Sequence, residues 1–150
     1  FDIGYLNLVN QFSTQMTNKS KKIILEASAG ELLDKISILE IKLVKIKNQN
    51  SQQEINKEYK LLKEAQASNI EMSDKIKNLF KEIKDINLKL WNIEDKIRIC
   101  EKNKDFGKNF IDLARAVYST NDKRSKIKSE INEAVGSNIK EVKQYEDYWL

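Results

Sequence analysis

An unbroken heptad pattern through the middle of the chain limits its fold more than any other feature of the sequence. Apolar residues alternate steps of four and three positions over this stretch: Met72, Ile76, Leu79, Ile83, Ile86, Leu90, Ile93, Ile97 and Cys100. The spacing predicts one continuous helix, from about residue 68 to residue 102, with these side chains on one side. At 1.5 Å per residue, a helix of ~30 residues is about 45 Å long and needs partner helices to be stable.

The apolar stripe of this helix is wider than a two-stranded coiled coil requires. Further apolar side chains lie beside the seam: Phe80, Leu88, Trp91 and Ile99. A wide stripe is typical of a helix that packs against several others in one domain. The chain also has no Pro and only four Gly, which favours long helices. The sequence therefore predicts an all-α fold, an antiparallel helical bundle of long hairpins with coiled-coil-like packing and no substantial sheet.

Capping boxes mark the predicted starts of the helices. Ser28, with a Glu three positions later, opens a helix whose seam is Leu32, Ile36, Leu39, Leu43 and Ile46. Similar boxes begin at Ser51, before a shorter helix, and at Ser68, before the long one. The last helix is predicted over Lys108–Val135, with Gly136 as its left-handed C-terminal residue.

The bundle is predicted over residues 21–136, between two shorter segments. Residues 1–20 combine a polar linker with an amphipathic stretch that has apolar residues at helical spacing: Ile3, Leu6, Val9 and Phe12. Residues 22–27 are apolar and β-branched, and could form a brief extended piece. Residues 137–150 form a tail that must fold back on the body or face a partner, because it carries an aromatic cluster of Tyr145, Tyr148 and Trp149.

Composition excludes several kinds of site. With no His and one Cys, the usual zinc sites, Ser-His triads and Cys-His pairs cannot form, and the few glycines make no phosphate-binding loop. No metal and no cofactor is therefore predicted. Cys100, on the apolar side of a helix, indicates a packed thiol and a reducing, cytoplasmic location. No stretch approaches the roughly 20 apolar residues of a membrane span, and a chain that begins at Phe1 is interpreted as processed or cut from a longer one.

Polar residues gather where the long helix ends and the last helix breaks its apolar pattern. In an antiparallel hairpin, the face of Glu94 and Arg98 is expected to lie opposite Arg115, Tyr118 and Asp122. The candidate ligand-binding residues are Trp91, Glu94, Asp95, Arg98, Arg115, Tyr118, Asn121, Asp122 and Arg124.

Two interpretations of this cluster stay open. The first is an ion-pair network that sets helix register. The second is a small anion pocket, with Arg98, Arg115 and Arg124 as donors and Glu94 or Asp95 as acid or base. Because di-metal bundles combine Glu with His, a metal site in this His-free chain is disfavoured.

A second polar set lies on the first long helix: Glu31, Asp34, Lys35 and Glu40. Capping explains Glu31, whereas Glu40 lies beside the apolar seam, and structural and functional interpretations of it are balanced. A basic run in the last helix consists of Lys123, Arg124, Lys126 and Lys128. A solvated helix face is favoured over a nucleic-acid surface for this run, because Asp122 and Glu130 flank it and the net charge of +4 is not concentrated.

Several strings resemble an uncharacterised bacterial all-helical family of unknown function. They are GELLDKISILEIK (30–42), LWNIEDKIRICE (90–101), DFG (105–107), LARAVYSTNDKR (113–124) and IKSEIN (127–132), and the resemblance spans about residues 23–145. It implies a short cytoplasmic protein, sometimes associated with glycosyltransferase or surface-polysaccharide regions, and no activity. The polar residues of both sets above would be among its signature positions, which favours a functional role for them.

These observations lead to one favoured function and two rivals. The favoured function is a helical interaction or scaffold module that binds another protein or its own copy through the seam and the aromatic tail. The first rival is a site for a small anionic ligand, binding or enzymatic, at the cluster between the two longest helices. The second is nucleic-acid binding by the basic run, which is disfavoured.

Overall fold

The computed structural model describes residues 23–144 and residue 146. Within them the chain forms four helices and no strand, which confirms the all-α prediction. The helices are α2 (Ala29–Lys45), α3 (Gln49–Asn69), α4 (Asp74–Asn103) and α5 (Lys108–Val135). The predicted amphipathic segment within residues 1–20 and the aromatic side chains of Tyr145, Tyr148 and Trp149 lie outside the described residues.

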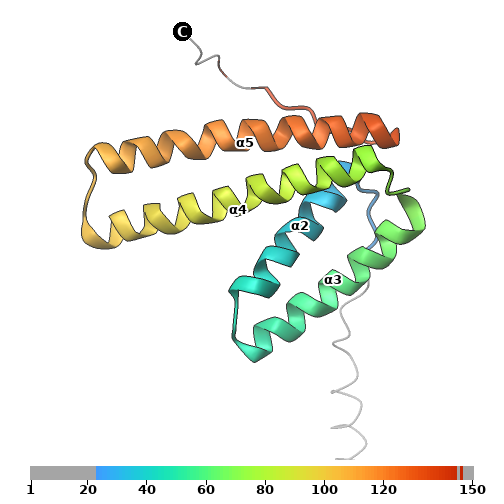
Figure 1. Cartoon of the computed structure of the whole chain (residues 1–150), viewed down its shortest axis with the longest axis horizontal. Helices are drawn as coiled ribbons and strands as arrows, with labels where there is room; N and C mark the ends of the chain where they lie inside the picture. Colours follow the sequence, from blue (N-terminus) through green and yellow to red (C-terminus); the bar gives the residue numbers. More distant parts are fainter. Residues whose placement is uncertain (1–22, 145, 147–150) are drawn as a thin grey trace, which may run out of the picture.

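The helices form two hairpins that cross (Figure 1). Helices α4 and α5 run side by side for their whole length, and α2 packs steeply against both of them. Helix α3 contacts α2 and lies beyond it. The α2–α3 hairpin covers only the half of the α4–α5 hairpin that is remote from the α4–α5 turn (Figure 1). The turn end of that longer hairpin, residues 99–111, therefore projects as an arm.

The apolar core lies where α2 meets the longer hairpin. Leu33 and Ile36 of α2, Ile83 of α4 and Ile131 of α5 have no exposed surface, and Leu79 is nearly buried. Burial of one such side chain stabilises the fold by about 1.5–3 kcal/mol. The first half of the predicted seam is therefore part of the core of a multi-helix domain. Two of the residues expected to widen the buried stripe, Leu88 and Ile99, are instead 38% and 57% exposed.

Local capping explains where the helices begin and end. The Ser28 side chain accepts from the backbone N–H of Glu31, as predicted. Helix α5 has the predicted bounds, and Gly136 ends it with φ of +72°. Because a left-handed residue without Cβ carries no steric penalty, glycine suits this position.

Two of the predicted starts are wrong. Helix α3 begins after Asn48, whose side chain accepts from the N–H of Ser51, and not at Ser51 itself. Helix α4 begins after Ser73, whose hydroxyl accepts from the N–H of Ile76. Ser68 lies in the last turn of α3, where its hydroxyl donates to the carbonyl of Glu64.

The segments that flank the bundle contact it at one end. An extended piece was predicted over residues 22–27, and its described part, residues 23–27, forms neither helix nor strand. After α5, the Ser137 hydroxyl accepts from the N–H of Ala29 at 2.9 Å and Asn138 donates to Glu26 at 2.8 Å. Cys100 is buried, as predicted. In the part of the chain described here, each helix is too polar or too short to cross a membrane.

Candidate functional site

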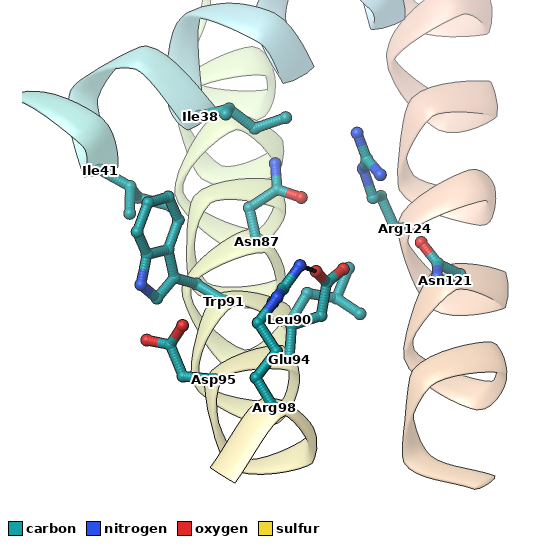
Figure 2. A pocket seen from close by; sticks show the side chains of 10 residues that line it. All are labelled: Ile38, Ile41, Asn87, Leu90, Trp91, Glu94, Asp95, Arg98, Asn121 and Arg124. Carbon is teal, nitrogen blue, oxygen red and sulfur yellow. Dashed lines mark hydrogen bonds and ion pairs between the residues drawn. The ribbon is translucent and has the colours of Figure 1, made fainter. Parts of the chain in front are cut away.

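A cavity of about 350 Å³ opens where α2, α4 and α5 meet (Figure 2). We call it the junction cavity. Its volume is at the lower end of the range of small-molecule sites. Two isoleucines of α2 line it above, and residues 87–98 of α4 and two polar residues of α5 complete it. The lining residues are Ile38, Ile41, Asn87, Leu90, Trp91, Glu94, Asp95, Arg98, Asn121 and Arg124.

A buried polar network, which we call the Asp34 network, forms one wall of this cavity. Arg124 of α5 donates to both carboxylate oxygens of Asp34, from Nε at 2.9 Å and from Nη2 at 2.5 Å. Asn87 of α4 donates through Nδ2 to Asp34 Oδ1 and to Ser37 Oγ, both at 2.8 Å. Ser37 in turn donates to the backbone carbonyl of Asp34 at 2.7 Å. One carboxylate therefore joins three helices.

The Asp34 network places a charge pair inside the protein. Asp34 is only 3% exposed, and the side chain of Arg124 is 28% exposed. The hydrogen bonds to Asp34 raise the pKa of the Arg124 guanidinium above its ordinary value. Because a buried carboxylate is costly without partners, this bidentate pair fixes how α2 sits on α5.

The remaining charged residues of the cavity all lie on α4. Arg98 donates to Glu94 at 3.0 Å, one helical turn away, and both side chains are largely exposed (Figure 2). Such surface pairs contribute little to stability. Trp91, Asp95 and Asn121 make no hydrogen bond or ion pair with another residue of the described chain. Their polar groups are available to a ligand.

The structure brings together six of the nine candidate ligand-binding residues. Trp91, Glu94, Asp95, Arg98, Asn121 and Arg124 line the cavity. Arg115, Tyr118 and Asp122 do not, and the first two are exposed. They were expected opposite Arg98, but successive helix positions differ by about 100°. Helix α5 is rotated so that Asn121 and Arg124 face the cavity instead.

This geometry changes the chemistry expected of the arginines. Arg124 is bound by Asp34, Arg98 is bound by Glu94, and Arg115 lies outside the cavity. The three were expected to act together as donors to an anion. In this structure two of them are already neutralised by carboxylates of the same chain.

Comparison with known families identifies the chain. Residues 23–148 match DUF6165, a family of unknown function. The chain belongs to this family. The predicted resemblance to an all-helical family of unknown function is thereby confirmed. Neither the curated proteins nor the solved structures include a match to the chain.

The residues of the second predicted polar set contact side chains of three different helices, α3, α4 and α5. Asp34 belongs to the Asp34 network, and Lys35 of α2 lies 2.5 Å from Glu58 of α3. Glu40 is half-buried. Its carboxylate accepts hydrogen bonds from Lys84 of α4 at 2.6 Å and from the hydroxyl of Tyr59 at 3.2 Å. Burial, together with the charge of Glu40, raises the pKa of Tyr59.

Glu31 does more than occupy a capping position. Its carboxylate accepts from Lys128 of α5, which also donates to Glu141 of the C-terminal segment at 2.8 Å. Burial alone would lower the pKa of Lys128, but its two carboxylate partners raise the pKa above the ordinary value. Beside this cluster, the Asn132 side chain accepts from the N–H of Gly30 at 2.7 Å. The first turn of α2 is therefore fixed to α5.

Two residues of the basic run, Arg124 and Lys128, take part in these contacts. Arg124 and Lys128 are paired with carboxylates, whereas Lys123 and Lys126 are exposed. In the described residues no three His, Cys, Asp or Glu side chains gather as a metal site would require.

Sequence reasoning missed Asn87 and Ser37, the two neutral members of the Asp34 network. Asn87 lies four positions after Ile83 and three before Leu90, which is core spacing on a helix. A polar residue at such a position was a usable signal. Lys128 was interpreted as part of a solvated face, although it continues a stripe at steps of four from Arg124 to Asn132.

Proposed function

We propose that this protein is a small-molecule-binding helical module whose ligand occupies the junction cavity. The observation that carries the proposal is the presence of Trp91, Asp95 and Asn121 at this cavity without partners among the described residues. An indole, a carboxylate and an amide offer a flat apolar surface, a charge and a hydrogen-bonding group. Their combination around an apolar cavity is the usual composition of a ligand site.

The rigidity of the cavity wall also supports a binding role. Asp34 holds Arg124 and Asn87, so two lining residues from different helices are fixed by one buried group. A preorganised wall lowers the cost of ordering side chains when a ligand binds. The wall therefore defines the shape of the site, and the groups without partners are left to recognise the ligand.

A library of small fragments, screened by ligand-observed NMR, tests this proposal. Asn121→Trp would fill the cavity from α5, and Ser129→Trp would place the same side chain at an exposed position of the same helix. We expect fragments that bind the wild type and the Ser129 variant but not the Asn121 variant. Fragments that bind all three proteins equally, or no fragment that binds at all, would contradict a ligand site in the junction cavity.

A second candidate function, a helical interaction module, has its own support in the arm. Ile99, Phe106 and Ile111 are 57%, 50% and 53% exposed at the turn end of the α4–α5 hairpin. Helix α2 does not cover this end (Figure 1). Exposed apolar side chains that form one patch are typical of association surfaces.

A second copy of the chain is the partner that fits the arm. Both signs of charge alternate along it, as in the pairs of Lys108 with Asp112 and of Glu101 with Lys104. Two such hairpins could meet in antiparallel orientation without strong like-charge repulsion, and would form a four-helix bundle with two-fold symmetry.

Light scattering over a range of protein concentrations tests the association. We expect the mass to rise towards that of a dimer, and a variant with Ile99→Glu and Ile111→Glu to remain a single chain. Val44→Glu, at a 68% exposed apolar residue of α2, is the control that leaves the dimer intact. A single-chain mass at every concentration would rule this candidate out.

A further inference from the structure

We propose that the ligand of the junction cavity carries a cationic group, a primary ammonium or a guanidinium, on an apolar or aromatic body. This inference rests on the proposed function and specifies its ligand class. Asp95 would pair with the cationic group, the indole of Trp91 would cover it, and the isoleucines of α2 would contact the apolar body.

The charges that line the cavity point to a cation. Four of its lining residues are charged: Glu94, Asp95, Arg98 and Arg124. The bidentate bond to Asp34 neutralises Arg124, and the 3.0 Å ion pair neutralises Arg98 and Glu94 against each other. Asp95 is left as the one lining charge with no ion pair inside the described part of the chain. Together with Asp34, the cavity therefore has three carboxylates against two guanidinium groups.

An anion would have to compete with carboxylates that already bind both arginines of the cavity. At Arg124 an anion would have to share a guanidinium whose Nε and Nη2 already donate to Asp34, a carboxylate only 3% exposed. At Arg98 an anion would compete with Glu94, which accepts from one nitrogen of an exposed guanidinium. Such competition is weak at an exposed pair, so an anion at Arg98 is the main rival outcome of the test below.

Trp91 adds an independent preference for a cation. It lies four positions before Asp95, so the two side chains share one face of α4. In the view of Figure 2 the Asp95 carboxylate lies at the lower end of the indole and Ile41 at its upper end. An indole face attracts ammonium and guanidinium groups within about 6 Å. A cation placed between the ring and the carboxylate would interact with both.

The rest of the cavity determines what the cation is attached to. Ile38 and Ile41 of α2 and Leu90 of α4 form its apolar side, and Asn121 offers an amide from α5 (Figure 2). An apolar body in contact with the isoleucines removes their surface from water. A small hydrated cation without such a body, for example a free ammonium ion, would gain little from this site.

A charge series on one apolar body tests the inference. The probes are 2-phenylethylamine, 2-phenylethanol and 3-phenylpropionate, which are cationic, neutral and anionic at pH 7. We expect the amine to bind about tenfold more tightly than the alcohol, from the combined carboxylate and indole contacts. The anion is expected to bind more weakly than the alcohol. Affinities are measured by NMR titration on the wild-type chain at low ionic strength.

Variants then assign the preference to named groups. Asp95→Asn is expected to remove the tenfold preference for the amine over the alcohol. Asp95 is exposed and without a partner in the described chain, so this variant should fold normally. Asp74→Asn is the matched control, because it removes an exposed carboxylate at the other end of α4 and should leave the preference intact.

The outcomes separate the inference from the proposed function. Equal binding of all three probes, or preferred binding of the anion, would overturn the cation inference and leave a ligand site in place. A preference for the amine that persists in Asp95→Asn would also overturn it. Failure of every probe, combined with failure of the fragment screen on wild-type protein, would overturn the proposed function itself.

Discussion

Replacing Asp34 by Asn tests how strongly the wall of the junction cavity is held. The substitution keeps the size of the side chain and removes its charge. Arg124, whose side chain is 28% exposed, would then lose the carboxylate that accepts from its Nε and Nη2. The Asn87 amide would keep Ser37 as an acceptor.

The magnitude follows from the burial of the pair. Removal of one partner from a fully buried ion pair costs about 3–5 kcal/mol, because the other charge is left without compensation. Arg124 keeps some contact with water, so we expect the lower end, a loss of about 3 kcal/mol in the free energy of unfolding. For a chain of this size such a loss lowers the melting temperature by about 10 °C.

Urea unfolding followed by circular dichroism measures this loss. Arg124→Met is expected to cost a similar amount, because it leaves the buried Asp34 charge with Asn87 alone. The double variant should cost much less than the sum of the two, with a coupling energy of about 2–3 kcal/mol. Glu94→Gln, which breaks the exposed pair with Arg98, serves as the control and should change stability by less than about 0.5 kcal/mol. Additive single effects, or an Asp34→Asn protein as stable as the wild type, would refute this account of the cavity wall.

Further predictions concern the ends of the helices. Gly30→Ala should destabilise the fold by at least about 1 kcal/mol in thermal melts, because the added Cβ would lie 2.6 Å from the carbonyl oxygen of Lys128. The loss is expected although Ala is the better helix former. A stabilised variant would contradict this close approach. Ser73→Ala should lower the free energy of unfolding by about 1 kcal/mol, because Ser73 caps α4. Ser68→Ala should lower it by much less. A larger loss for Ser68→Ala than for Ser73→Ala would place the start of the helix at residue 68. The hydrogen bond from Lys128 lowers the pKa of Glu141 below its ordinary 4.5, so its contribution is complete above pH 4.5 and is lost as pH falls through the folded-state pKa. The stability difference between wild type and Glu141→Gln should therefore shrink below pH 4.5, and a difference that stays constant would show that this contact does not titrate.

The ends of a helix could be predicted from the sequence where they depend on a capping residue and its near neighbours. The start of α2 at Ser28 and the end of α5 at Gly136 each depend on one residue and its near neighbours. The failures at Ser51 and Ser68 have a physical cause, because a Ser three positions before a Glu is also common within a helix. The residues that cap these two helices, Asn48 and Ser73, lie in the short loops that follow α2 and α3.

The candidate site was predictable in part. The break in the apolar pattern of α5 and the polar end of α4 both point to the region of Arg98 and Arg124. The partner of each charge was not predictable, because Asp34 and Arg124 are 90 positions apart in the chain. The rotation of α5, which selects Asn121 over Asp122, is decided by packing against α2 and α4, and a periodicity argument cannot resolve a shift of one position.

The central claim is that the junction cavity binds a small molecule, and the indole N–H resonance of Trp91 in a ¹H–¹⁵N spectrum tests it most directly. The Trp91→Phe variant assigns this signal, and Asn121 supplies a second one from its side-chain amide on the opposite wall. Titration with 2-phenylethylamine and with the hits of the fragment screen should shift both signals saturably, with the same dissociation constant at each. Signals that stay unchanged while resonances elsewhere respond, or that do not respond to any compound, would contradict the account.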